Sequence, residues 1–333
     1  MDWLGGSVTS QGINSNTTVI DVTYLCNAKC SYCQWGAPVT PDRVHLSLDQ
    51  LLIPDASLMA LGTQRIVISG GEPRLHPRLN EIAAYYRERV GELVIMTNGY
   101  GLTISEMAKL EGLGFTGVTV SVDSVDPQVA WRTRKTPPET LARLIATLES
   151  FGPQSTGVEL GINAVVSRPT ATWRNVSELL NLGIRSHAQF VKFQPVFDDG
   201  FVSRSDPSLR LVESDADALA EIGGCVEGSR IRTNPPGFWM DLHDLVLGAR
   251  LDPSACDLGP CRSVSTRGEL GICFWLSSSR LGRLKDPLQV DMVARARSEF
   301  EGAKRACTVG PQCFCTQPLE HHWSEGRGRP GHH

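Results

Sequence analysis

Between residues 17 and 197 the sequence alternates between short apolar segments and segments with helical spacing, and this alternation restricts the fold most strongly. The apolar segments are rich in β-branched residues and end in glycine or polar residues, which is typical of buried strands. Six such strands alternating with helices predict an α/β fold with a parallel sheet. The expected strands are residues 17–25, 64–73, 92–99, 117–124, 158–167 and 187–197, and the expected helices are residues 47–62, 76–91, 103–114, 137–152 and 172–184.

The pattern changes after residue 197, and further boundaries are expected there. A polar stretch precedes one more expected helix within residues 214–226, and from about residue 254 the chain is rich in cysteine, glycine and proline. A hairpin-like stretch covers residues 265–276. The expected segments are an N-terminal segment (1–16), the sheet-containing domain (17–200), a connecting segment (201–253), a cysteine-rich domain (254–320) and a disordered tail (321–333).

Composition excludes several classes of protein. The chain has 333 residues, 41% hydrophobic residues and a net charge of −4, so it can bury a core and shows no basic footprint for nucleic acid. No apolar run has the length of a membrane span, and the first residues lack the pattern of a signal peptide. We therefore expect a cytoplasmic protein with no membrane partner, in which clustered cysteines serve metal binding or catalysis rather than disulfides.

Three cysteines are grouped on one short segment, with the spacing C-x3-C-x2-C at Cys26, Cys30 and Cys33. Thiolates on one loop can bind three corners of a cubic iron–sulfur cluster, which leaves the fourth iron open to a substrate or cofactor. Two alternatives remain at this point. The cysteines could be structural, or they could bind zinc with His45 as the fourth ligand.

Polar or glycine-rich segments follow five of the expected strands. In barrels of alternating strands and helices, the chemistry lies at the carboxyl ends of the strands. These segments are therefore expected on the same face as the three-cysteine loop. They are Ser69–Pro73, Thr97–Gly99, Ser121–Asp123, Asn163–Ser167 and Gln194–Pro195.

The motifs CNAKCSYC, SGGEP, TNG and SVDS, in this order over about residues 17–197, resemble those of the radical SAM superfamily. The resemblance implies a partial (β/α)6 TIM-like barrel and a [4Fe–4S] cluster on Cys26, Cys30 and Cys33. It implies S-adenosylmethionine (SAM) on the open iron, bound through its amino and carboxylate groups. It also implies reductive cleavage of SAM to methionine and a 5′-deoxyadenosyl radical, which removes a hydrogen atom from a substrate. A flavodoxin- or ferredoxin-type protein would donate the electron.

The strand ends supply the candidate SAM contacts. Glycines let backbone approach a ligand closely, and Glu72 can accept a hydrogen bond from the methionine ammonium. Ser121 and Asp123 can reach the ribose hydroxyls or the carboxylate, unless they form an Asx-type turn or a helix cap. Arg132 or Arg134 could bind the carboxylate, unless both are solvated surface charges. By resemblance, Tyr32 and the strand edge around Asn163 and Val165 flank the adenine. The full predicted set is Tyr32, Gly70, Gly71, Glu72, Pro73, Asn98, Ser121, Asp123, Arg134, Asn163 and Val165.

The late cysteines form a second group. Cys261 and Cys273 bracket the hairpin-like stretch, and Cys307, Cys313 and Cys315 follow it. This arrangement resembles the twitch extension, a shortened relative of the SPASM extension of the same superfamily, and implies one auxiliary [4Fe–4S] cluster. Cys261, Cys273 and two of the last three cysteines are the expected ligands. A zinc knuckle is the alternative, and Cys225 and Cys256 are interpreted as free or structural thiols.

The predicted substrate is a small polar natural-product precursor: a sugar, an aminocyclitol or a nucleoside. An auxiliary cluster near the substrate would favour oxidation, and epimerisation, decarboxylation and C–C bond formation are the other expected outcomes. Only 25 residues precede Cys26, which leaves little room for a peptide-leader-binding domain. A peptide-modifying enzyme is the first alternative, and an enzyme of cofactor biosynthesis like the molybdopterin-pathway cyclase is another. A non-catalytic iron–sulfur scaffold or redox protein is an alternative of a different class. Candidate substrate contacts are Gln34, Trp35, Arg74, His76, Gln194, Trp239 and Asp241. Packing is the plainer interpretation of Trp239, and a cap or surface position is the plainer one for His76.

Overall fold

The structure is a computed structural model that describes residues 17–33, 45–51, 63–151, 157–196, 206–249, 262–265, 268–271, 280–283 and 298. Its described strands form a curved sheet in the order β10-β9-β8-β1-β2-β3-β4-β5-β6-β7. Strands β1 to β7 pair in parallel, as the alternation predicted. They are β1 (Thr17–Thr23), β2 (Arg65–Gly70), β3 (Glu92–Thr97), β4 (Gly117–Ser121), β5 (Glu159–Val166), β6 (Phe190–Pro195) and β7 (Arg232–Thr233).

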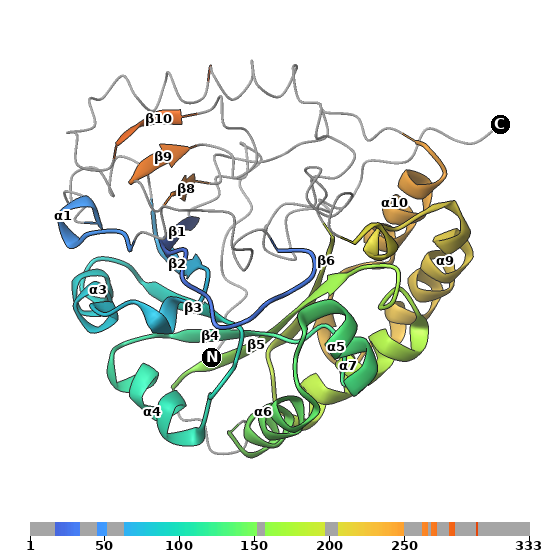
Figure 1. Ribbon diagram of the computed structural model, residues 1–333, viewed down its shortest axis with the longest axis horizontal. Helices are drawn as coiled ribbons and strands as arrows, with labels where there is room; N and C mark the ends of the chain where they lie inside the picture. Colours follow the sequence, from blue (N-terminus) through green and yellow to red (C-terminus); the bar gives the residue numbers. More distant parts are fainter. Residues whose placement is uncertain are drawn as a thin grey trace.

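Helices cover the outer side of this sheet, as Figure 1 shows for α3, α4, α6 and α10. Their apolar side chains form one large core with alternate strand residues such as Ile20, Ile68 and Ile95. The described helices are α1 (Leu48–Leu51), α3 (Leu79–Arg87), α4 (Ile104–Gly112), α5 (Pro127–Arg134), α6 (Pro138–Phe151), α7 (Trp173–Arg185), α9 (Ala216–Cys225) and α10 (Pro236–Val246). Within the described residues, no helix has the length and apolarity needed to cross a membrane.

The concave side of the sheet carries a second, small apolar cluster of Val19, Val67 and Val94, with Met96 packed against it. Successive side chains of a strand point to opposite faces. The concave side is therefore lined by the residues that alternate with the main core. This side is the interior of the partial barrel. Because β1 to β6 are parallel, their carboxyl ends lie at the same end of the sheet as the three-cysteine loop, which follows β1.

The described strands of the late region extend the barrel sheet. β8 (Arg262–Val264) pairs in parallel with β1, and β9 (Glu269–Gly271) pairs antiparallel with β8. β10 (Arg280–Arg283) pairs antiparallel with β9. The antiparallel β8–β9 pair is the hairpin expected after Cys261, closed by the Gly268 amide donating to the Ser265 carbonyl at 2.8 Å.

Two helices differ from the sequence expectation. The sequence analysis does not predict helix α5, although Asp126 caps it by accepting from the Gln128 and Val129 amides. It also does not predict α10, which is helical from Pro236. Both helices have proline in the first turn, where the missing N–H is not needed.

Candidate active site

The three-cysteine loop follows the carboxyl end of β1 and is hydrogen-bonded to the last turn of helix α5. The Ser31 amide donates to the Thr133 carbonyl at 2.8 Å, and the Ser31 hydroxyl donates to the Arg132 carbonyl at 3.0 Å. Carbonyls in the last turn of a helix have no intrahelical partner, so they can accept from a loop. Cys26, Cys30 and Cys33 are half-buried and form no disulfide. The loop is therefore anchored to α5 through Ser31, and these bonds do not use a cysteine thiol.

The glycine turn after β2 fixes the other side of the same loop. The Gly71 amide donates to the Thr23 carbonyl at 2.7 Å, and the Glu72 amide donates to the Leu25 carbonyl at 2.7 Å. A Cβ on Gly71 would lie 2.3 Å from the Leu25 oxygen, and Gly70 adopts φ +120°. The close approach that demands glycine is thus to the cysteine loop. The sequence interpretation named a ligand instead, and a ligand contact of these glycines stays a prediction.

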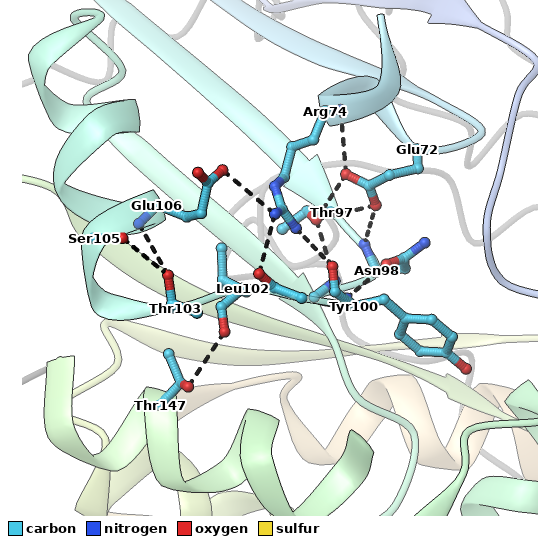
Figure 2. A network of polar contacts seen from close by, with 12 residues as sticks. Glu72, Arg74, Thr97, Asn98, Tyr100, Leu102, Thr103, Ser105, Glu106 and Thr147 are labelled. Carbon is cyan, nitrogen blue, oxygen red and sulfur yellow. Dashed lines mark hydrogen bonds and ion pairs between the residues drawn. The ribbon is translucent and has the colours of Figure 1, made fainter. Parts of the chain in front are cut away.

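Glu72 is almost completely buried, at 1% exposure, and joins two strand ends (Figure 2). Its carboxylate accepts from the Thr97 hydroxyl at 2.9 and 3.0 Å and from the Asn98 amide at 2.8 Å. Its Oε1 also accepts from the Arg74 amide at 3.2 Å. Burial raises the pKa of Glu72, while the Asn98 and Thr97 hydrogen bonds oppose this rise. The predicted acceptance from the methionine ammonium stays a prediction, and Pro73, also predicted, begins the short 3-10 turn that follows Glu72.

Asn98 connects the TNG segment to the cysteine loop. Its Nδ2 donates to Asn27 Oδ1 at 2.7 Å and lies 3.6 Å from Cys26 Sγ, while its Oδ1 accepts from the Tyr100 amide. The sequence analysis named Asn98 but missed Asn27. The signal was present, because Asn27 immediately follows Cys26 in the motif.

Four of the predicted SAM residues meet in one hydrogen-bonded group. Tyr32 donates its hydroxyl to Asp123 Oδ2 at 2.6 Å and accepts from Arg134 Nη1 at 2.9 Å. Asp123 Oδ1 accepts from the Val165 amide at 3.0 Å and lies 3.5 Å from Arg134 Nη1. Asp123 and Arg134 are both buried. Asp123 is thus neither a helix cap nor an Asx turn, since it joins the cysteine loop, α5 and β5.

The two arginines considered for the methionine carboxylate differ in position. Arg134 is buried within this group, whereas Arg132 points elsewhere and donates to Ser208 Oγ at 3.2 Å. The assignment of Arg134 to the methionine carboxylate stays a prediction. Ser121 and Asn163 are paired across β4 and β5, and both alternate with main-core residues, so they lie on the concave side.

Electrostatics of the group keep the phenol protonated. Burial raises the pKa of Tyr32 well above its usual value, with Arg134 opposing and Asp123 reinforcing the rise. The same environment affects the loop, where burial raises the pKa of the Cys30 thiol to about 12 and Arg134 lowers it. A metal deprotonates a thiol that coordinates it. The thiolate form of Cys30 is therefore expected with bound iron.

The residues fit a cubic cluster better than a single metal ion. In the described part of the chain, no group of three His, Cys, Asp or Glu side chains is arranged to hold one metal ion. A cluster binds each cysteine at a separate iron, so the thiols need not converge on one point. His45, considered as a zinc ligand, places its Nδ1 2.9 Å from Thr23 Oγ1 and stacks edge-on against His76.

Several candidate substrate contacts have structural roles. Arg74 donates to the Tyr100 and Gly101 carbonyls and pairs with Glu106 (Figure 2). His76 is buried, so its expected surface position was wrong, although its Nδ1 does cap the Arg78 amide. Burial lowers the pKa of His76. Trp239 is fully buried against Phe193 and Phe238, which agrees with its interpretation as a packing residue.

Two further candidate substrate contacts lie within described elements. Gln194 lies half-buried on β6, and Asp241 lies within α10. The other expected contacts and ligands fall outside the described residues. They are Gln34, Trp35, Cys261, Cys273, Cys307, Cys313 and Cys315.

Part of the chain that includes this site is similar to known proteins. The model of the radical SAM superfamily matches residues 20–165. GTP 3′,8-cyclase of Yersinia pestis is 35% identical over 113 residues, which is 33% of this chain and 34% of that protein. The chain thus spans about a third of the length of this curated relative.

Two solved structures share the fold. SuiB of Streptococcus suis, bound to S-adenosylmethionine, has a TM-score of 0.65 at 14% identity over 90% of this chain and 72% of SuiB. The enzyme anSMEcpe, with bound AdoMet, has a TM-score of 0.63 at 19% identity over 89% of this chain and 87% of its own. Residues 20–165 of this chain therefore match the radical SAM superfamily model, and the chain shares the fold of two proteins that have been crystallised with S-adenosylmethionine.

Proposed function

We propose that this enzyme reductively cleaves SAM to modify a small polar substrate, which is a sugar, an aminocyclitol or a nucleoside precursor of a natural product. One observation carries the cofactor part of this proposal. Tyr32 of the three-cysteine loop forms one hydrogen-bonded group with the buried residues Asp123, Arg134 and Val165, and the charges of Asp123 and Arg134 act on the Cys30 thiol. Buried charged groups of this kind are unusual without a functional reason.

Cys26, Cys30 and Cys33 would hold the cluster, which supplies the electron for SAM cleavage when it is bound. The chain's own residues then position SAM. Arg134 supplies a cation for a carboxylate, and it is oriented by the Tyr32 hydroxyl and by Asp123. Asn98 and Glu72 fix the neighbouring strand end against the loop. The predicted contacts of Ser121 and Asn163 with the nucleoside belong to this proposal.

The substrate class is supported by the concave side of the barrel. Polar residues line it on several strands, including Asp21, Ser69, Ser121 and Asn163, and these strands end on the face where we propose that SAM binds. GTP 3′,8-cyclase of Yersinia pestis acts on a small polar molecule according to its name. A polar interior suits a substrate rich in hydroxyl and amino groups.

A peptide substrate is the second candidate, because SuiB has also been crystallised with its precursor peptide SuiA. That structure has a TM-score of 0.61 at 13% identity and covers 84% of this chain and 64% of SuiB. A likeness at this sequence identity shows a shared fold and says nothing about the substrate. We therefore keep the small polar substrate as the proposed function and treat peptide modification as an outcome of the tests.

The late cysteines are proposed to bind one auxiliary [4Fe–4S] cluster in a twitch-like domain over residues 254–320. The electron acceptor that this cluster would provide favours a net oxidation of the substrate. A flavodoxin- or ferredoxin-type donor in the cytoplasm would reduce the first cluster. The described hairpin of β8 and β9 supports this arrangement, since it lies between the positions of Cys261 and Cys273.

Iron content tests the assignment of both sites. After anaerobic reconstitution we expect about eight irons per chain for two cubic clusters, falling to about four in a Cys26/Cys30/Cys33→Ala variant. Cys225→Ala is the matched control, because Cys225 is an exposed free thiol far along the chain from the loop. With dithionite and SAM, wild type and control should form 5′-deoxyadenosine, and the triple variant should form none. Iron that stays unchanged in the triple variant would refute the assignment of the first site.

A further inference from the structure

Asp21 is a buried carboxylate that the proposed cofactor site does not use. Its neighbours Ile20 and Val22 belong to the main core under the helices, and Val19 belongs to the small cluster on the concave side. Because strand residues alternate between faces, Asp21 lies on the concave side with Val19. Its cross-strand partner in β2 is Ser69.

The carboxylate of Asp21 lacks the partners that a buried charge requires. It is 6% exposed, and its Oδ1 has no hydrogen-bond partner in the part of the chain that the structure describes. Burial raises the pKa of Asp21 to about 7, and the hydrogen bond with Ser69 opposes the rise. No charged group is among the causes of this shift. Burying such a carboxylate without a countercharge is unfavourable, so its retention calls for a reason.

The position of Asp21 relative to the cofactor loop gives that reason. Asp21 precedes Thr23, the last residue of β1, by two residues, which corresponds to about 7 Å along a strand. Ser69 directly precedes the glycine turn that holds the cysteine loop. Ser69 and Met96, on the same side, are only half-buried, so the surface beside Asp21 can be reached from the barrel interior. A molecule placed there would lie next to the SAM-binding end.

We propose that Asp21 binds a protonated amine of the substrate within the barrel, with Ser69 orienting the carboxylate. This inference rests on the proposed function and narrows it to an aminated sugar, an aminocyclitol or an amino nucleoside. An ammonium group supplies both the missing donor to Oδ1 and the missing positive charge. A hydroxyl group would supply only the donor. A charge-assisted hydrogen bond in a buried site is also stronger than a neutral one.

Matched pairs of small molecules test this proposal. The pairs are glucosamine and glucose, streptamine and scyllo-inositol, and 3′-amino-3′-deoxyadenosine and adenosine. Binding to the reconstituted holoenzyme with SAM is measured by calorimetry, together with the rate of 5′-deoxyadenosine formation. The variants are Asp21→Asn and Ser69→Ala. Thr18→Val is the control, because Thr18 lies on the same strand but faces the helices, where its hydroxyl contacts Thr63 at 3.0 Å.

The expected result is that at least one aminated compound binds wild type and the Thr18 variant alike, and binds better than its hydroxyl twin. The Asp21 variant should bind that compound at least about tenfold more weakly, and the Ser69 variant should lie between them. Iron content of each variant shows whether it has assembled. If the Asp21 variant does not assemble, the Ser69 variant alone decides, because it keeps the carboxylate and loses only its orientation.

Two results would overturn the inference, and they differ in what else they refute. If aminated and hydroxyl twins bind equally, or if the aminated compound binds both variants as tightly as wild type, the role of Asp21 is refuted while the small polar substrate stands. If none of the compounds binds or stimulates 5′-deoxyadenosine formation, both the role of Asp21 and the proposed substrate class are refuted. Formation of 5′-deoxyadenosine without added compound reports separately on the radical SAM site.

Discussion

The burial of Asp21 predicts how the stability of the protein depends on pH. An aspartate ionises near 3.8 in the unfolded chain but at about 7 in the folded protein. Between these values the folded state holds a proton that the unfolded state has released. Stability therefore falls as the pH rises from about 4 to about 7, and it changes little above that. A pKa difference of this size corresponds to about 4 kcal/mol in total, of which about 3 kcal/mol is lost between pH 5 and pH 8.

Replacing Asp21 by asparagine removes this dependence while keeping the shape of the side chain. For a chain of 333 residues, an unfolding entropy of about 2.1 cal/mol/K per residue converts 3 kcal/mol into a Tm change of about 4 °C. We expect the Tm of Asp21→Asn minus that of wild type to increase by this amount from pH 5 to pH 8. Scanning calorimetry of the anaerobic holoenzyme at intervals of one pH unit measures it.

The control and a second variant sharpen this test. Thr18→Val removes a buried hydroxyl that does not titrate in this range, so its Tm difference from wild type should be the same at every pH. Ser69→Ala removes the hydrogen bond that lowers the Asp21 pKa, so wild type and this variant should diverge further as the pH rises. A Tm difference between Asp21→Asn and wild type that is constant from pH 5 to pH 8 would show that the carboxylate is ionised throughout, and the reasoning from burial would be wrong.

Two further predictions concern the cysteine loop. Gly71→Ala should reduce the iron per chain to less than half after reconstitution, because the new Cβ would lie 2.3 Å from the Leu25 carbonyl oxygen. In the Gly112→Ala control no atom lies within 4 Å of the new Cβ, so this variant should keep its iron. Equal iron loss in the two variants would contradict a specific effect of the Gly71 contact. Tyr32→Phe should keep full iron content but weaken SAM binding about tenfold, since Asp123 and Arg134 lose their common partner. Equilibrium dialysis with labelled SAM measures this, and unchanged affinity would show that the tyrosine is only a packing residue.

The parallel sheet could be predicted from the sequence because each strand repeats the same local pattern. The strand expected at residues 158–167, for example, is found at Glu159–Val166, paired in parallel with both neighbouring strands. Apolar runs and the turn residues that end them are local signals, so they are readable without any knowledge of tertiary contacts. The three-cysteine loop was found for the same reason.

Helix α5 shows why part of the site could not be predicted. Its sequence, PQVAWRTR, has no regular apolar stripe, and its buried residues include Thr133 and Arg134. Arginine is buried there only because Tyr32 and Asp123 come from distant parts of the chain to meet it. Such pairing is a tertiary property, and it overrides the general expectation that arginine is solvated. The Asp126–Pro127 start of the helix was the one local signal that could have revealed it.

The glycine turn makes a related point about how residue type and role are connected. The sequence indicates correctly that backbone must approach closely at Gly70 and Gly71, since only glycine tolerates such contact. It cannot indicate which group approaches, and here that group is the peptide backbone of the cysteine loop. The loop is consequently held between the glycine turn on one side and the end of α5 on the other. Because the hydrogen bonds of neither clamp use a cysteine thiol, substitutions in the clamps should affect iron binding without touching a ligand.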